Sequence, residues 1–438
     1  NGVLVETSAF GSVDLLNLSL DGQSTAGVYY AKDISGALSG SVTNSAGSAF
    51  YYGEDTNTDV VFNGISISSN AIGIQTDGSG DMTLTDVTMG NTQDVVINGI
   101  SNVDFIEGTI DTSSVVVTGK GQFDRLRQLD VTLTADGVGV ADSTVTLLDA
   151  TGASSGNGVT DSTGVVQDIT FTTAIVDSTG LVNSSLSGYK VMSIAKVQYF
   201  YNNSTDNMGD FRYASQGVSL TDASGNTAAV PLTTRVTDRV CYTFTSTSYT
   251  SIQPCNGLSS SGTRNLNDGN GGQMTEYGYS GGLTKSQSNK VLMIDSGIFY
   301  LKSATDYDFN GSTILSTGGY SFGDTQRWLV SYPYGAKVTM NDAKVYGVAP
   351  NDDDGVMFGL EIGGYSSPIT SFSANNTVFS NIAKIEMQNG YKSSARNWEI
   401  NDVSITNSTI SHFRGYTPIS NAIYYIDICV MLGGGDGA

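Results

Sequence analysis

The residues in this sequence with the clearest capacity for chemistry are the carboxylates of a short acidic run. Asp352, Asp353 and Asp354 are adjacent and are followed by Gly355. Carboxylate oxygens in a loop suit calcium, so these three residues are the candidate metal ligands, and calcium is the one cofactor considered. GEDTNTD at 53–59 is a weaker version of the same pattern. The alternative, which the sequence favours, is a solvated acidic turn.

The three cysteines offer redox chemistry. Cys241 and Cys255 flank the Ser/Thr/Tyr-rich loop VCYTFTSTSYTSIQPC, and Cys429 lies far away in an apolar stretch. We expect a disulfide between Cys241 and Cys255, with Cys429 as a buried thiol. The alternative is three reduced thiols in a cytosolic protein, but the rest of the composition is typical of an extracellular one.

Histidine chemistry depends on a single residue. His412, in SHFRG, is the only histidine, so a Ser/His/Asp or Cys/His arrangement would have to recruit it. One histidine and three distant cysteines also give no usual zinc-ligand spacing. We therefore predict no catalytic residues.

Asparagine supplies candidate modification sites through the N-x-[S/T] pattern. With 31 Asn, and Ser plus Thr at 102 of 438 residues, about seven such sites arise by chance, so their number is not informative. Each is a glycosylation candidate if the protein is secreted. The candidates are Asn17, Asn183, Asn202, Asn203, Asn310, Asn375 and Asn407.

The composition indicates an all-β protein. Charged residues make up 14% of the chain, while apolar and aromatic residues make up 39%, which is too much for a disordered chain. Val, Ile, Thr, Tyr and Phe suit a half-buried pleated surface, and no long stretch has helical apolar spacing. With 438 residues the chain is long enough for two or three domains.

The net charge of −22 argues against a polyanionic partner, and we predict no nucleic-acid binding. No membrane span is expected either. The most apolar stretch, 422–432, is about half of the roughly 20 residues that a spanning helix needs, and it contains Asp427. Because the chain begins NGVLVETS without an initiating Met, we interpret it as a mature or excised form.

Two interleaved series of apolar segments run through the first part of the chain, up to position 125. One series includes LSGSV (38–42), FNGIS (62–66) and LTDVT (84–88); the other includes FYYGED (50–55) and VINGIS (96–101). Both advance by roughly 22 residues, which is typical of a solenoid coil with two strands and turns. The octapeptides DVVFNGIS (59–66) and DVVINGIS (94–101) are nearly identical, but they belong to different series, so their separation is not the period.

These stacked segments resemble right-handed parallel β-helix proteins, in particular surface proteins of archaea and bacteria. The resemblance implies coils of about 22 residues whose inward side chains stack on their equivalents in the next coil. Residues 1–126 are the first part of this predicted β-helix. Residues 291–438 return to the same style at wider steps, with the segments VTMNDAKVYG (338–347), FSANNTVFSN (372–381) and WEINDVSITN (398–407).

Many parallel β-helix proteins are polysaccharide hydrolases or lyases, so we compared the chain with the polygalacturonase pattern. Asn57-Thr58-Asp59 matches its Asn-Thr-Asp element and the 352–354 run supplies carboxylates, but there is no Gly-His-Gly and no Arg-Ile-Lys. The basic cluster of a lyase is also missing. Because fold alone does not determine function, we predict that the chain is not an enzyme.

Residues 127–236 interrupt this period. Alternating apolar residues around 129–152, followed by the Thr160-Asp161…Gly164 turn, predict antiparallel strands. The pattern resembles carboxypeptidase-regulatory-like and bacterial Ig-like modules, which implies an inserted β-sandwich. Residues 237–290, with the cysteine pair and RNLNDGNGGQ, are expected to be an irregular connector.

The two ends of the chain are strand-like, and neither contains an amphipathic helix that could cap a solenoid. Uncapped ends favour head-to-tail contacts between copies of the chain. We therefore expect an extracellular, cell-surface structural subunit of a filament, sheath or surface layer, with other copies, and cell-surface glycans, as its partners. The alternatives are a carbohydrate-active β-helix enzyme and an adhesin or viral fibre that binds glycans through exposed tyrosines.

Overall fold

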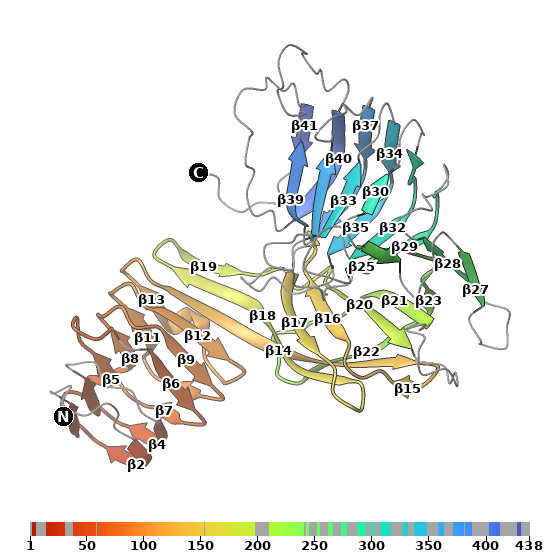
Figure 1. Ribbon diagram of the computed structural model, residues 1–438. Helices are drawn as coiled ribbons and strands as arrows, with labels where there is room; N and C mark the ends of the chain where they lie inside the picture. The colour runs from red at the N-terminus through yellow and green to blue at the C-terminus, as the bar shows by residue number, and fades with distance from the viewer. Residues whose placement is uncertain are drawn as a thin grey trace. The chain divides into compact units, whose positions relative to one another are not determined.

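The computed structural model is built almost entirely of β-strands (Figure 1). The described part of the chain includes one 3-10 helix, η1 (Thr112–Ser114), and no helix there is long and apolar enough to cross a bilayer. The structure describes residues 2–5, 15–30, 38–57, 59–152, 154–197, 210–240, 242–244, 252–254, 262–265, 273–277, 287–294, 299–301, 307–316, 327–331, 337–347, 358–362, 371–380, 382–387, 403–411 and 427–430.

The chain divides into two compact units. The first contains residues 1–130, 167–187 and 219–228, and the second contains the remainder. The expected all-β class and the stacked coils are confirmed: the chain forms a β-solenoid of about ten turns.

The first unit contains a parallel six-stranded sheet that confirms the expected period. Val28 pairs with Phe50, Phe50 with Ile74, Ile74 with Val95, and Val95 with Val115. Each partner thus lies one coil further along the chain, at the spacing that the apolar residues predict. The strands of this sheet are β1 (Val3–Val5), β3 (Val28–Tyr30), β5 (Ser48–Tyr52), β8 (Ile72–Thr76), β11 (Gln93–Ile97) and β13 (Val115–Val117).

The second series of apolar segments forms another parallel stack. Leu38 pairs with Phe62, Phe62 with Leu84, and Leu84 with Phe105. The strands of this stack are β2 (Leu15–Asp21), β4 (Leu38–Thr43), β6 (Val60–Asn63), β7 (Ser66–Ser68), β9 (Met82–Thr85), β10 (Thr88–Gly90), β12 (Asn102–Ile106) and β14 (Gln122–Ala135). The two similar octapeptides therefore lie in different sheets, β6 in one and β11 in the other, as their series predict.

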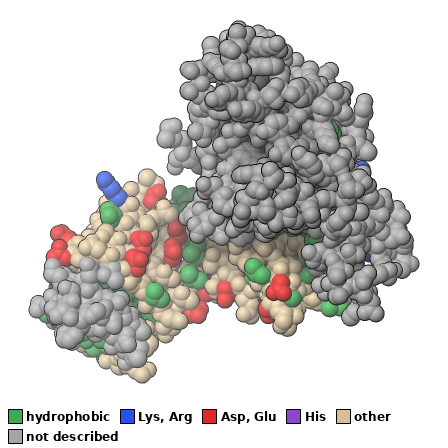
Figure 2. Space-filling view, viewed as in Figure 1, with side chains coloured by type: hydrophobic (Ala, Val, Ile, Leu, Met, Phe, Trp, Pro, Cys, Tyr) green, Lys and Arg blue, Asp and Glu red, His purple; other side chains and the backbone are tan. Residues whose placement is uncertain are grey.

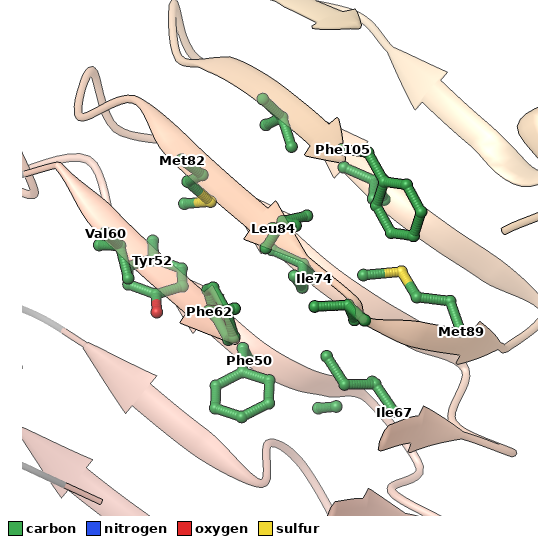
Figure 3. Close-up of a cluster of buried hydrophobic side chains, with 14 of the residues drawn as sticks. Phe50, Tyr52, Val60, Phe62, Ile67, Ile74, Met82, Leu84, Met89 and Phe105 are labelled. Atoms are coloured by element: carbon green, nitrogen blue, oxygen red, sulfur yellow. The ribbon is translucent and has the colours of Figure 1, made fainter. Parts of the chain in front are cut away.

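Alternation along each strand places the apolar side chains inside the coil. In β6, Val60 and Phe62 are buried while Val61, between them, is 57% exposed. Phe62 meets Phe50 of the facing sheet edge to face, with ring centroids 5.0 Å apart (Figure 3). Each fully buried side chain of this kind contributes roughly 1.5–3 kcal/mol. One continuous core therefore runs from Val28 to Phe123.

The two Asn-Gly corners of these octapeptides have different physical requirements. Gly64 has a φ of +62° and open space around it, so it needs only backbone freedom. At Gly99, by contrast, an added Cβ would overlap the carbonyl oxygen of Gly78, one coil away. Gly119 stands in the same relation to Gly99. Glycine at this second corner is required because backbones of successive coils approach closely.

Residues 127–236 contain antiparallel strands, as the sequence predicts. In the second unit, β16 (Thr144–Leu148) pairs with β17 (Ser154–Val159) and with β20 (Lys190–Val197), which continues to β21 (Asp210–Gly217) and β23 (Thr234–Arg235). In the first unit, β18 (Val165–Asp177) pairs with β19 (Gly180–Asn183). Strand β14 also pairs with β15 (Val138–Gly139), β18 and β22 (Asn226–Pro231). The Ig-like sandwich itself stays a prediction.

The second unit contains a second parallel stack with longer coils. Val338 pairs with Phe372, so the first of the two wider steps expected from sequence is confirmed. The second step, expected from 372 to 398, is wrong. Phe372 pairs with Val403 and not with the start of the segment 398–407. The strands of this stack form three faces. The first face has β29 (Val291–Ile294), β32 (Thr313–Ser316), β35 (Lys344–Gly347) and β38 (Val378–Ser380), and the second has β31 (Tyr307–Asp308), β34 (Lys337–Asn341), β37 (Ser371–Asn375), β40 (Val403–Ser411) and β41 (Asp427–Val430). The third face has β30 (Phe299–Leu301), β33 (Arg327–Ser331), β36 (Phe358–Ile362) and β39 (Ile382–Met387).

The predicted connector, 237–290, begins with a strand of this second stack. β24 (Asp238–Val240) pairs in parallel with β29, so Asp238 lies beside Leu292. The segment also contains β25 (Tyr242–Phe244), β26 (Ile252–Pro254), β27 (Gly262–Asn265) and β28 (Gln273–Tyr277).

The contrast between the two corners leads to a direct prediction. Gly99→Ala should destabilise the first unit by about 3 kcal/mol, the upper end of the usual cost of overpacking, since the methyl group overlaps backbone that cannot move without shifting a coil. Gly64→Ala should cost only about 1–2 kcal/mol, because it places an L-residue at a positive φ. Native-state hydrogen exchange of peptides covering 60–120 reports both values. Equal effects of the two substitutions would contradict this account of the corners.

Candidate functional site

Most of the site residues expected from sequence lie outside the described residues. These are Asp352, Asp353, Asp354, Cys241, Cys255, Asn202 and Asn203; His412, which the sequence assigns to no site, also lies outside the described residues. Cys429 and Asn407 fall in β41 and β40, where only the backbone is described. The calcium site and the disulfide therefore stay predictions.

The acidic segment 53–59 is built as a corner. The Thr56 hydroxyl is buried and donates to the Gly53 carbonyl at 2.6 Å, and Glu54 and Asp55 are exposed. The Asp59 carboxylate accepts from the Asp81 backbone N–H at 3.0 Å, one coil on. Within the described ranges, no three His, Cys, Asp or Glu side chains are grouped as a metal ion would require.

A buried ladder of polar side chains runs along one corner of the first solenoid. Asn70 is 2% exposed; its Oδ1 accepts from the Ser45 N–H at 2.8 Å and its Nδ2 donates to the Val42 carbonyl at 3.1 Å. The same Nδ2 donates to Oδ1 of Asn91 at 2.8 Å. These bonds satisfy backbone groups that the turn leaves without strand partners.

The ladder continues into the next coils through a buried carboxylate. Nδ2 of Asn91 donates to Oδ1 of Asp94 at 2.9 Å, and the Ser114 hydroxyl donates to Oδ2 of Asp94 at 2.7 Å. Asp94 is 2% exposed, and these donors supply hydrogen bonds to its buried carboxyl oxygens. Sequence reasoning attributed the corner asparagines to turn preference alone and missed this ladder. The available signal was an Asn within two residues of the end of two strands in one stack, Asn70 after β7 and Asn91 after β10.

A second polar column lies on the outside of the same solenoid. The Asp77 carboxylate accepts from Nδ2 of Asn98 at 2.7 Å, and Oδ1 of Asn98 accepts from the Thr118 hydroxyl at 2.7 Å. Tyr51 donates its hydroxyl to Asp77 at 2.5 Å, and this bond, followed by burial, raises the pKa of Tyr51. These side chains are joined to the coils before and after them.

Two half-buried tyrosines of the first solenoid, Tyr29 and Tyr51, form a stacked pair. The rings of Tyr29 and Tyr51 are 4.8 Å apart and inclined by 24°. Because they stack on one another, the ring faces between them are not available to a sugar. Inside the core, Tyr30 and Tyr52 stack in the same way, 4.7 Å apart. Burial raises the pKa of Tyr30 to about 12.

Two carboxylates are placed side by side on an outward sheet face. Asp104 of β12 is in register with Asp124 of β14, and neighbouring strands lie about 4.8 Å apart. Burial raises the pKa of both carboxyls, and the charges of Asp124 and Asp81 raise that of Asp104 further. Gln122 donates to Asp124 at 2.6 Å and partly offsets the effect. Pairs of this kind occur in catalytic sites.

An ion cluster around the buried Arg127 lies at the last coil of the first unit. Arg127, 4% exposed, donates to the carbonyls of Glu107 and Gly108. Its Nε donates to the Asp222 carbonyl at 3.0 Å, and the Asp222 carboxylate lies 3.1 Å from Nε of Arg125. The loop 219–228 is thereby fixed to a strand far earlier in the chain. This cluster has a structural role.

Two of the described glycosylation candidates are accessible. Asn17 and Asn183 are both exposed. Asn310 is engaged in the second stack, because its Oδ1 accepts from the Asn341 N–H at 2.8 Å. Asn375 is exposed, but the hydroxyl of its sequon residue Thr377 is buried and donates to the Met340 carbonyl.

Acidic side chains outnumber basic ones on the face drawn in Figure 2. In the first solenoid several described carboxylates bond to the neighbouring coil; Asp21, for example, accepts from Thr43 and Asn44 at 3.0 and 2.6 Å. The bonds from Asn44 and Thr43 hold the pKa of Asp21 below its usual value. The outer polar residues thus form columns between coils.

The buried ladder predicts a large effect of one deletion. Asn70→Ala leaves the Ser45 N–H and the Val42 carbonyl without this partner, and each such loss costs about 1–3 kcal/mol. We expect a loss of about 3–5 kcal/mol, measured by hydrogen exchange of peptides covering 38–100. Asn102→Ala, at an exposed position, is the control and should change stability by less than about 0.5 kcal/mol. A neutral Asn70→Ala would show that the ladder is dispensable.

The Asp104–Asp124 pair predicts a pH dependence. Because the folded chain holds these protons more tightly than the unfolded chain, stability from this pair is present at low pH and is lost as pH rises through the raised pKa values. Asp104→Asn should therefore stabilise the first unit at pH 7, and its advantage over the wild type should shrink as pH falls towards about 4. Thermal melting at several pH values measures this difference. A constant difference across that range would contradict the assignment.

Comparison with known proteins finds no family model, no curated protein and no solved structure that matches this chain.

Proposed function

We propose that this chain is an extracellular structural subunit that assembles with copies of itself into a cell-surface filament, sheath or surface layer. The observation that supports this best is the direction of the polar contacts in the first solenoid. Asn70, Asn91 and Asp94 inside, and Asp77 and Asn98 outside, bond along the stack of coils. A site built for catalysis directs several polar groups at one point, whereas these contacts stiffen the stack.

The physical consequence of such contacts is resistance to bending and local opening. Parallel strands are joined by backbone bonds at every coil, and the corner ladder adds buried side-chain bonds that cannot break singly without exposing an unpaired group. A rigid element of this kind suits a load-bearing role. In this proposal the antiparallel strands between 127 and 236 form the Ig-like module, which decorates or cross-links the rod.

The composition supports the secreted, cell-surface location that this proposal includes. The chain is rich in Ser, Thr and Asn and has a net charge of −22, which keeps a large surface soluble. The accessible sequon at Asn17 would carry a glycan in such a location. Cell-surface glycans remain proposed partners, and a Cys241–Cys255 disulfide would fit the same oxidising environment.

The second candidate function is a carbohydrate-active enzyme, and one observation favours it. Asp104 and Asp124 are in register on adjacent strands, and both have raised pKa values. Retaining glycosidases use two carboxyl groups about 5–5.5 Å apart, one of them with a raised pKa. The same arrangement also follows from two in-register aspartates on a solenoid face, so it does not require catalysis.

Imaging and sedimentation of the full chain distinguish these functions. We expect concentration-dependent polymers in negative-stain electron microscopy and a fast-sedimenting fraction in the ultracentrifuge. A monodisperse monomer at high concentration would overturn the structural role. Release of reducing sugars or unsaturated products from acidic polysaccharides, abolished by Asp104→Asn, would establish the enzyme instead.

A further inference from the structure

One strand of the first unit ends a sheet without a second partner among the described strands. In the sheet order, β14 is followed by β18 and then by β19, which is last. Within the described part of the chain β19 pairs only with β18, with Leu181 opposite Val176 and Val182 opposite Ile175. The backbone groups on its other side are therefore an open edge, which is a template for another strand.

The hairpin that carries this edge is rigidly built. Asp177 Oδ1 accepts from the Thr179 N–H at 2.7 Å and from its hydroxyl at 2.5 Å, which fixes the turn. Gly180 has a φ of +124° and open space around it, and glycine adopts such a positive φ without steric strain. After the strand, the Ser184 N–H donates to the Thr173 carbonyl at 2.9 Å. The edge is thus held in an extended conformation before any partner arrives.

Two side chains of β19 are apolar and exposed. Leu181 is 42% exposed and Val182 is 58% exposed. Leu181 lies opposite Val176, which belongs to the core of the first solenoid, so it extends the core layer to the edge of the sheet. An added strand would cover both side chains and continue that layer.

The charge pattern favours a second copy of this chain as the occupant. No charged residue occurs from 178 to 189, although the whole chain has a net charge of −22. Two copies repel each other through their net negative charge, and a neutral edge lowers the electrostatic cost of close approach. Monomeric proteins usually protect such an edge with Lys, Pro or a bulge, and β19 has none of these.

A second end strand, β17, is a less suitable association edge than β19. β17 also ends a sheet, and its Val159 is 60% exposed. However, its pairing with β16 contains a register shift, and its sequence, SSGNGV, includes two glycines. An irregular, glycine-containing edge is a poor template, so exposure alone does not select β19.

We propose that β19 is a self-association edge, at which β19 of a second copy adds antiparallel and continues the sheet across the two molecules. This inference rests on the proposed structural function and names one of its contact surfaces. Because β19 is short, the contact is small compared with the roughly 1,000 Å² expected of a stable interface. It therefore acts within a polymer, where other contacts raise its effective concentration.

The test compares two charge substitutions at exposed valines in the full chain. Val182→Lys should lower the association constant at least tenfold in sedimentation velocity, because it places like charges on both sides of the contact. Val159→Lys, the matched control, makes the same change at the other end strand and should leave association at the wild-type level. Equal association of the two variants would contradict the proposal.

A second measurement locates the contact independently of affinity. Val182→Cys chains treated with a short bismaleimide should give a 182–182′ link, identified by mass spectrometry, and Val159→Cys chains should not. If the wild type forms polymers but the 182–182′ link is absent and Val182→Lys polymerises normally, the edge is not used, while the structural function stands. If the wild type never associates, both the proposed structural function and the proposed association edge are wrong. A glycan on Asn183 in native polymer would also overturn the proposal, since it would block the edge.

Discussion

The structure of this chain depends on the in-register stacking of one coil on the next. Each inner strand of the first solenoid is hydrogen-bonded to the equivalent strands of the coils before and after it, so an error in one coil affects its neighbours. Successive coils approach closely at Gly78, Gly99 and Gly119, where there is no room for a side chain. The spacing of the strands, the apolar alternation and the corner residues all follow from this constraint.

Stacking also determines what the polar residues do. Every coil has corners at which the backbone turns away from its strand partners, and a buried turn needs substitute donors and acceptors. Asn70, Asn91 and Asp94 supply them, and they do so by bonding to each other as well as to the backbone. On the outside, in-register positions bring like charges together, as at Asp104 and Asp124, and the raised pKa of Asp104 results from burial and from that proximity.

Much of the fold could be predicted from the sequence, because the coil period appears directly in the apolar residues. Phe50, Phe62 and Leu84 recur in two series, and the registers of the strands confirm them. The later step, predicted from 372 to 398, was wrong, because the partner of Phe372 is Val403. Repeated Asn/Asp corners have similar sequences, so they do not define the register by themselves. The buried ladder was missed because an asparagine in a turn has the same sequence signal whether its amide faces solvent or the interior. The exposed edge at β19 depends on pairing between β14 and β18, which no local pattern shows.

The central claim is that this chain works as a repeated structural element, and the structure of its assembled form tests it most directly. Cryo-electron microscopy of native material should show many copies in regular contact, with the strands of each solenoid about 4.8 Å apart and β19 of neighbouring copies adjacent. Isolated single copies, with a polysaccharide bound across Asp104 and Asp124, would contradict the account.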